Sequence, residues 1–391
     1  MQIRLGQLKV FPFVSMMLFA LYASMDFNAI DMQVVSYAML ALMLLGAVVA
    51  LYFITLQRTI SRTDLLSLAF MAIVTSSSFF HGTDGIHFVY VALSVCFLRF
   101  FFNFYQKGLV PLLVGLAIGF SIATFAQIFQ LIIQPDLWIL PDKKEVTGYI
   151  MGGNYNQVGI CLLVTILLDL LCIRISRWFY LLLIPCGVIC VAIPLMVGSM
   201  TAVTAIILFM VICMIPSKHL RRILIMVVFI SVFLFQILVC FNGKGIENSD
   251  LMVWFIEDVL QKDITFTNRT HMWDSALRVI VESPLWGYGY PDKEWYLNNM
   301  SSFAIGPHNI LLATLIYGGV FAFVIYICLV GYAIIQVWRV QNYWADCIGA
   351  GLAVVSMMSL MEVYSISILF TIIVLAEYHH QLFKPSTRQD E

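Results

Sequence analysis

Charged side chains are scarce in this sequence. Only 11% of its 391 residues are Asp, Glu, Lys or Arg, whereas 62% are hydrophobic. A soluble globular domain carries about 25% charged residues, so no soluble fold could bury this much apolar side chain. We therefore expect the lipid bilayer to be the main solvent of an all-α chain. The net charge of −1 gives no sign of a nucleic-acid partner, and we expect none.

Nucleotide-binding motifs and paired cysteines are also missing. The short loops contain no Walker sequence, no GxGxxG after a strand and no DxD, so nothing there is expected to hold a nucleotide. The nine cysteines lie mostly inside apolar runs and form no CxxC, which argues against a disulfide framework or a zinc site. His81, Asp84 and His87 share one short loop, a combination that is common by chance. We expect neither a metal nor a cofactor.

Apolar runs of membrane-spanning length fill the chain instead. Each is close to the roughly 20 residues that a helix needs to cross a bilayer. The first is long for the core of a signal peptide and lacks a good cleavage site, so we interpret it as a retained span. The twelve runs are Leu8–Met25, Val34–Leu56, Leu65–Phe80, Ile86–Phe104, Leu109–Ile133, Gln157–Ile173, Trp178–Val197, Thr201–Ile215, Ile223–Phe241, His308–Trp338, Trp344–Val363 and Ser365–Phe383.

Positive charges occupy alternate loops between these runs. The short loops on the other side carry Asp26, Asp31 and Asp84 but no Lys or Arg. The positive-inside rule then predicts that both termini are cytoplasmic and that the number of spans is even. The basic loops hold Arg4 and Lys9, Arg58 and Arg62, Arg99 and Lys107, Arg174 and Arg177, Lys218, Arg221 and Arg222, Arg339, and finally Lys384 and Arg388.

The predicted organisation is therefore a polytopic all-α membrane protein of about twelve helices. Residues 1–241 form the first nine spans, residues 242–306 a large extracytoplasmic loop, and residues 307–391 the last three spans with a short cytoplasmic tail. Because the cytoplasmic loops are short, polar chemistry is expected mainly on the outer side.

Two amphipathic helices are predicted in the large loop. Apolar residues recur at helical spacing, first at Met252, Phe255, Ile256, Val259 and Leu260, and then at Trp273, Ala276, Leu277 and Ile280. We expect both helices to lie on the outer membrane surface. Arg269 is one turn before Trp273, and its planar guanidinium suits a lipid phosphate. The alternative is an arginine that merely snorkels to the interface.

Two further segments of the loop carry candidate site residues. Pro284-Leu285-Trp286-Gly287-Tyr288-Gly289-Tyr290 is rich in glycine and aromatics, and Tyr288 is either a membrane-belt anchor or a stacking surface for a sugar. Gly306-Pro307-His308-Asn309 opens a span. With Pro307 at the first helical position, the helix dipole would keep His308 neutral and able to act as a base. The free N–H groups there would attract a phosphate; the alternative is a polar cap.

Polar residues outside this loop are candidates for the same site. Asn154 and Asn156 lead into a span from the outer side, where they either bind sugar or cap the helix. Glu362 lies near the outer end of its span and is expected to face the site.

Taken together, these motifs resemble those of the O-antigen ligase/polymerase family. The resemblance rests on Arg269-x-x-x-Trp273-x-x-Ala276-Leu277, on Pro284-Leu285-Trp286-Gly287-Tyr288-Gly289, on Pro307-His308-Asn309, and on Gly153-Asn154-x-Asn156. It implies a membrane glycosyltransferase of the GT-C type that acts outside the membrane on oligosaccharides carried by undecaprenyl pyrophosphate. The catalytic histidine of the family corresponds to His308 and its loop arginine to Arg269, with Asn309 beside the histidine in the expected site.

One departure from the family pattern concerns a second arginine. The family usually places it after Ser or Thr at the outer end of a middle span, where this chain has Met200 in Gly198-Ser199-Met200-Thr201. The candidates to replace its charge are Lys143, Lys144, Arg278 and Lys293.

The resemblance implies a surface-polysaccharide polymerase that joins lipid-linked repeat units at the bacterial cytoplasmic (inner) membrane. Its expected partners are the lipid-linked oligosaccharide, the bilayer, a flippase and chain-length regulator proteins. One alternative is a ligase that passes a finished glycan to the lipid A core or another acceptor. Another is a polysaccharide flippase or transporter, although transporters usually carry ionisable residues near mid-membrane and repeated halves.

Overall fold

The computed structural model describes residues 10–27, 31–57, 60–106, 108–137, 147–242, 254, 269–301 and 306–382. The first predicted loop helix, Lys143, Lys144 and the tail after Leu382 lie outside these residues.

A helix coincides with every predicted span. The twelve are α1 (Val10–Ser24), α2 (Gln33–Gln57), α3 (Arg62–His81), α4 (Gly85–Phe104), α5 (Val110–Ile133), α6 (Tyr155–Ile173), α7 (Tyr180–Met196), α8 (Met200–Met214), α9 (Lys218–Phe235), α13 (Ile310–Arg339), α14 (Tyr343–Met358) and α15 (Ile366–Leu382). Eight helices of the described chain are long and apolar enough to cross a membrane, and α1, α8, α14 and α15 are shorter apolar helices. The all-α, multi-pass architecture is confirmed, whereas the number of twelve spans stays a prediction.

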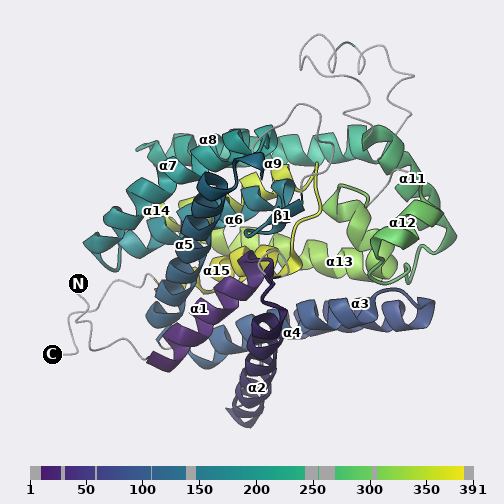
Figure 1. Ribbon diagram of the computed structural model, residues 1–391, viewed down its shortest axis with the longest axis horizontal. Helices are drawn as coiled ribbons and strands as arrows, with labels where there is room; N and C mark the ends of the chain where they lie inside the picture. The colour runs from purple at the N-terminus through teal and green to yellow at the C-terminus, as the bar shows by residue number, and fades with distance from the viewer. Residues whose placement is uncertain are drawn as a thin grey trace.

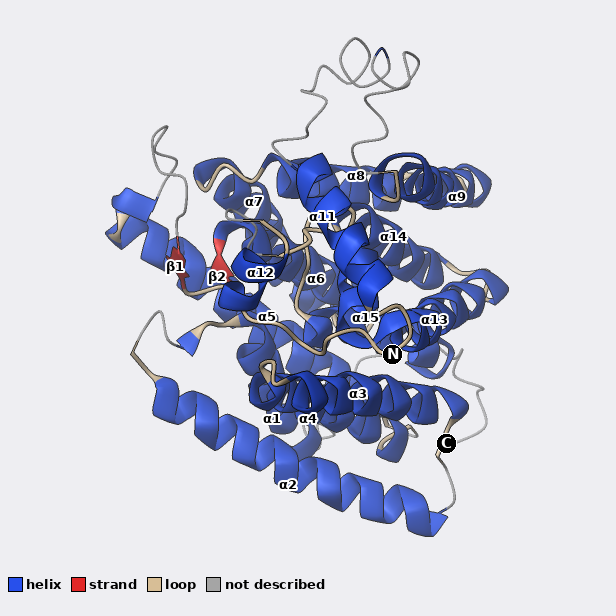
Figure 2. Ribbon diagram, turned by 90° about the vertical axis from the view of Figure 1, so that its right-hand side faces the viewer, coloured by secondary structure: helices blue, strands red, loops and turns tan. Residues whose placement is uncertain are grey.

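The helices form one bundle whose centre is built from α6 and α15. In α15 all residues from Ile366 to His379 are buried. By contrast, α2 lies along one edge of the bundle, far from α8 and α9 at the opposite edge (Figures 1 and 2). Two shorter helices, α11 (Arg269–Glu282) and α12 (Lys293–Asn299), gather at one end of the bundle (Figure 1). We call this end the α11 end.

Loops that are distant in sequence meet at the α11 end. A short antiparallel hairpin of β1 (Thr147–Tyr149) and β2 (Gly153–Asn154) precedes α6. It is held to the end of α1, because the Gly152 amide donates to the Ser24 carbonyl at 2.9 Å and the Asp26 amide donates to the Ile150 carbonyl at 2.7 Å. This packing places the hairpin and the start of α6 beside the end of α1.

Buried ion pairs lie at the opposite end. The Arg99 guanidinium bonds Asp64 at 3.1 Å and Glu377 at 2.7 Å, which joins α3, α4 and α15. Asp346 on α14 likewise bonds Arg221 at 2.6 Å and Arg222 at 2.8 Å on α9. Buried charges are tolerated when they are paired in this way. The basic ends of these helices are thus separated from the α11 end by the length of the bundle.

The second predicted loop helix is present as α11, but its surroundings differ from the prediction. Trp273 and Ala276 are fully buried, and Ile280 nearly so, because this face packs on α9 and α13. The expectation that the apolar stripe lies on the membrane surface is therefore wrong for α11. Helical periodicity shows that one face is apolar, but it does not distinguish lipid from protein as the covering material.

The Pro284–Tyr290 motif fills a break in α13. Gly318 and Gly319 have non-helical backbone angles, and Gly319, at φ +60° and ψ −158°, adopts a conformation that is almost confined to glycine. The carbonyls of Ile316 and Tyr317 accept hydrogen bonds from the Tyr288 and Gly289 amides at 2.6 and 2.9 Å. A break in a membrane helix is stable only if such freed backbone groups find partners, and this turn supplies them.

Candidate active site

The loop between α14 and α15, residues 359–365, is the framework of the candidate site. His308 comes from the segment before α13, and its Nδ1 lies 3.0 Å from Oε1 and 3.1 Å from Oε2 of Glu362. The two side chains are only 15% and 12% exposed. Carboxylate oxygens accept hydrogen bonds, so this geometry assigns a ring hydrogen to Nδ1, and in the neutral imidazole Nε2 is then the acceptor.

Two more donors fix the orientation of Glu362. Asn156, near the start of α6, donates from Nδ2 to Glu362 Oε2 at 2.7 Å. The Val363 amide donates to Oε1 at 3.1 Å. Because every described partner of this carboxyl group is a donor, Glu362 acts purely as an acceptor that orients the imidazole, as carboxylates do beside functional histidines.

Arg269 is fastened to the same loop. Its Nη1 donates to the Met361 carbonyl, one residue before Glu362. The guanidinium also acts on Tyr364: burial and then the Glu362 carboxylate raise the pKa of this phenol, while Arg269 lowers it. The structure therefore brings together three predicted residues, His308, Arg269 and Glu362. Arg269 and His308 contact neighbouring residues of the 359–365 loop.

The start of α13 differs from the prediction. The helix begins at Ile310, so Pro307 is not its first residue; Asn309, rather than His308, caps it and accepts from the Leu311 and Leu312 amides at 3.0 Å each. The Ile310 amide donates to the Ser359 carbonyl at 3.0 Å. The expected free N–H groups at this helix start are thus already bonded. The prediction that they attract a phosphate is wrong, because a residue that caps well competes with any anion.

His308 itself has an unusual backbone. Its φ is +44°, in the left-handed region that few residues other than glycine adopt. Asn309 next to it is fully buried and donates from Nδ2 to Gln236 Oε1 at 2.8 Å and to the Leu360 carbonyl at 3.2 Å. Strain of this kind persists where the surroundings hold the chain firmly, commonly at functional sites. Asn309 therefore positions His308.

The start of α6 is tied to the loop by a residue that the sequence did not single out. Gln157 donates from Nε2 to the Val363 carbonyl at 2.6 Å and accepts from the Ser365 amide at 3.2 Å. Asn154 accepts from the Asn156 and Gln157 amides at 3.0 Å each. Of its two predicted roles, Asn154 thus has the capping one, and Asn156 orients Glu362. A glutamine at a helix start gives no sequence signal for such a clamp.

Arg278 and Tyr288 lie away from this group. The Arg278 side chain is 69% exposed and faces Asp274 at 3.8 Å. The Tyr288 ring lies 5.1 Å from that of Trp295 and 5.4 Å from that of His81. Burial, followed by Glu282, raises the pKa of Tyr288. Both residues remain candidates for binding a more distant part of a substrate.

Met200, at the position where the family usually has a second arginine, also lies away from the site. Met200, the first residue of α8, is 66% exposed, so it does not contribute to the site. In the described chain, no group of three or more His, Cys, Asp or Glu side chains is arranged to hold a metal ion. Among the described residues, Arg269 is the cation that contacts the 359–365 loop, through the Met361 carbonyl.

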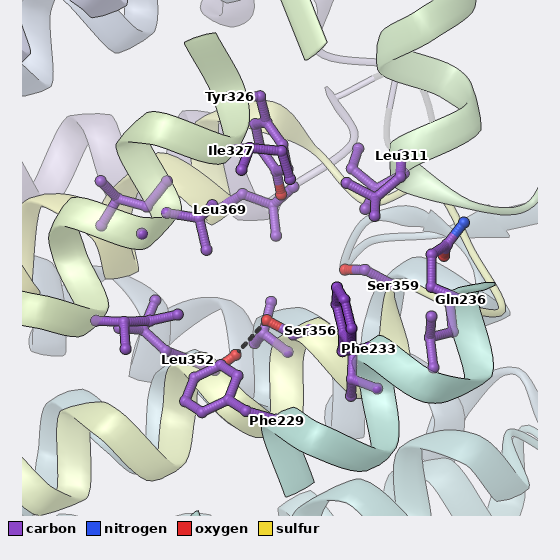
Figure 3. A pocket seen from close by; sticks show the side chains of 18 of the residues that line it. Phe229, Phe233, Gln236, Leu311, Tyr326, Ile327, Leu352, Ser356, Ser359 and Leu369 are labelled. Atoms are coloured by element: carbon purple, nitrogen blue, oxygen red, sulfur yellow. Dashed lines mark hydrogen bonds between the residues drawn. The ribbon is translucent and has the colours of Figure 1, made fainter. Parts of the chain in front are cut away.

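An apolar cavity of about 730 Å³ opens beside the site, between α9, α13, α14 and α15. Its walls are aliphatic and aromatic, with Phe229, Tyr326 and Leu369 among them (Figure 3). At one end it is lined by Gln236, Ile310 and Leu360, which are bonded to or adjacent to Asn309. The volume is in the range of about 300–1,000 Å³ that is usual for ligand sites. A long hydrocarbon chain fits these walls.

Comparison with known proteins agrees with the motifs. Residues 186–327 match the family described as O-antigen ligase, and no curated protein matches the chain significantly. The matched segment runs from α7 into α13, so it contains Arg269 and His308. Asn156 and Glu362 lie outside it and reach the site only through the fold.

Proposed function

With an O-antigen ligase family domain at residues 186–327, whose relatives are membrane glycosyltransferase-like enzymes, we propose that this protein is a surface-polysaccharide polymerase. It joins undecaprenyl-pyrophosphate-linked oligosaccharide units on the outer side of the bacterial cytoplasmic membrane, with both termini in the cytoplasm. The observation that carries the proposal is the contact of His308 with Glu362 beside Arg269. It supplies a base and a cation at one end of a multi-pass bundle.

The order of the groups around the site suits a lipid-linked donor. The apolar cavity takes the hydrocarbon chain. Arg269, which contacts the 359–365 loop at Met361, faces the pyrophosphate, whose paired oxygens match a guanidinium. His308, with Asn156 and Glu362 behind it, faces the first sugar. The order of apolar cavity, arginine and histidine thus matches the order of hydrocarbon chain, pyrophosphate and sugar in the donor.

The proposed reaction is a single displacement. An acceptor hydroxyl attacks the anomeric carbon of the donor sugar, and its proton passes to His308 Nε2. The bond between this carbon and the pyrophosphate oxygen breaks, and the electron pair leaves with undecaprenyl pyrophosphate. Arg269 stabilises the charge that develops on the leaving group, and the Glu362 carboxylate stabilises the imidazolium. The fixed positive charge takes the part that a metal plays elsewhere.

Two other functions share parts of this description. A ligase would use the same donor and base but transfer the finished glycan to the lipid A core or another acceptor. A flippase would move the lipid-linked glycan without forming a glycosidic bond. Polar groups that contact one another around the 359–365 loop favour an enzyme over a transporter. The motif wording Arg269-Thr270-x-x-Trp273 and Pro284-Leu285-x-Gly287-Tyr288-Gly289 favours the polymerase over the ligase.

Deletion of the gene in its host tests these alternatives. The surface glycan and the lipid-linked fraction are compared on gels. A ladder that collapses to single repeat units identifies a polymerase, which we expect to work with a flippase and chain-length regulators. A full ladder that stays on undecaprenyl pyrophosphate identifies a ligase. Unchanged ladders, together with glycolipid transport by the purified protein in vesicles, would overturn both.

A further inference from the structure

One end of the apolar cavity carries two buried polar groups that have no partner in the described residues. Ser359 is 2% exposed and Gln236 is 3% exposed. Among the described atoms, neither Ser359 Oγ nor Gln236 Nε2 has a hydrogen-bond partner. Both residues line the cavity, and the Ser359 hydroxyl points into it (Figure 3). A buried polar group without a partner costs about 1–3 kcal/mol, so both groups are expected to bond a ligand.

These groups adjoin the candidate site rather than the middle of the membrane. Gln236 begins a π-helical turn, Gln236–Cys240, that extends α9 and contacts α11; single π turns are frequent at functional sites. Ser359 begins the loop whose later residues Met361 and Glu362 hold Arg269 and His308. The two groups therefore lie at the boundary between the hydrocarbon walls and the charged residues.

Gln236 also connects the cavity to His308. Its Oε1 accepts from Asn309 Nδ2 at 2.8 Å, and Asn309 is the buried cap of α13 that follows His308. The amide oxygen is therefore engaged with Asn309, whereas the amide nitrogen of this cavity-lining residue has no partner among the described atoms. A ligand that accepts a hydrogen bond from Gln236 Nε2 would restrain this side chain, and its Oε1 would then restrain Asn309.

We propose that Gln236 and Ser359 bind an oxygen at the junction of chain and phosphate in the polyprenyl-linked donor, and that Gln236 thereby positions His308 through Asn309. The proposal rests on the proposed function for the identity of the lipid. We assign the donor as the occupant because Gln236, Ile310 and Leu360 line one end of the cavity, and Gln236 is bonded to Asn309, the residue next to His308. Gln236 and Ser359 are positioning and specificity residues; they take no part in the proton transfer.

Binding is measured on the full chain in nanodiscs, with undecaprenyl monophosphate as the probe and native mass spectrometry as the readout. Ser359→Ala and Gln236→Met should each weaken binding by about three- to tenfold, the usual effect of one hydrogen bond. Ser356→Ala is the matched control. This residue lines the same cavity, but its hydroxyl already donates to the Leu352 carbonyl at 2.8 Å, so binding should not change. Equal binding by all four proteins would overturn the proposal.

Competition separates the donor from ordinary membrane lipid. Dioleoyl phosphatidate carries the same phosphate on two acyl chains, and it should displace the probe only weakly. Displacement at equal concentration would show that the cavity takes bulk lipid and would reject the assignment. The competition experiment measures binding and not transfer, so displacement by phosphatidate would leave the proposed glycosyltransferase function intact. Conversely, a His308 variant that is inactive but binds the probe normally would agree with the inference.

Transfer kinetics test the link to His308. Gln236→Glu keeps Oε1 for Asn309 but removes the donor at the cavity, so donor KM should rise while kcat is retained, as for Ser359→Ala. Gln236→Met removes both groups, and kcat should fall as well. A purely structural role would lower the amount of folded enzyme without separating KM from kcat. The same kcat for Gln236→Met and Ser359→Ala, at equal melting temperature, would refute the link.

Discussion

His308 Nδ1 lies 3.0 Å from Glu362 Oε1, although the two residues are 54 positions apart in the chain. The contact crosses from the segment before α13 to the loop after α14. In the proposed reaction this contact leaves Nε2 of the ring for the acceptor hydroxyl and gives the imidazolium a buried counter-charge. This pairing is the geometry on which the proposed base chemistry depends.

His308→Ala should abolish nearly all transfer. Loss of a general base usually reduces the rate by about 10²–10⁴-fold, and the variant should accumulate the lipid-linked unit. Transfer is measured with purified protein and isolated lipid-linked donor. His87→Ala is the control, because His87 lies in the first turn of α4 with a side chain that is 70% exposed and paired with Asp84. Full activity of His308→Ala at normal expression would show that the base lies elsewhere.

Glu362→Gln should reduce kcat by about 10- to 100-fold, in the range seen when the partner of a functional histidine is removed. The amide replaces an acceptor by a donor that faces His308 Nδ1–H or Asn156 Nδ2. The pH profile of kcat should also change, because the imidazolium loses its counter-charge. Glu294→Gln is the matched control, since Glu294 lies in the first turn of α12 and is exposed. An unaltered pH profile would show that Glu362 does not act on His308.

Arg269→Lys should impair transfer by about tenfold, because an ammonium is a point charge and lacks the planar fork. The loss should appear with a pyrophosphate-linked donor. Arg339→Lys is the control, because this exposed arginine is the last residue of α13 and has no place in the proposed site. If both lysine variants turned over normally, recognition of paired phosphate oxygens by Arg269 would be rejected.

The positions of the helices could be predicted from the sequence, whereas the site could be predicted only in part. Hydropathy located each helix because a membrane span needs length and apolarity alone. The sequence also named His308, Arg269, Glu362 and Asn156. It could not show that Asn156 and Glu362 bond each other across 206 positions, because nothing local encodes such a contact. The roles of those residues remain predictions.

Predictions from local sequence patterns were wrong where contacts between distant segments determine the structure. Proline is favoured at the first helical position, yet α13 begins only at Ile310, because Asn309 supplies the capping oxygen. Gln157 and Gln236 went unnoticed because a glutamine carries no pattern; its partners decide what it does. The glycines of the Pro284–Tyr290 motif indicate only a turn in the sequence, because their tight contacts with α3 and α13 arise from the fold.

Gly319→Ala should destabilise the protein by about 1–3 kcal/mol, the usual cost of a strained backbone conformation. An added Cβ would lie 2.2 Å from the Leu285 carbonyl carbon, and φ is +60°. Gly331→Ala in the same helix is the control, because nothing lies within 4 Å of its Cβ position and its φ is not positive. Thermal unfolding in detergent should show a lower melting temperature only for Gly319→Ala. The turn also joins α13 to the loop that carries α11, so transfer should fall with stability. A melting temperature equal to that of Gly331→Ala would mean that the turn does not stabilise the break in α13.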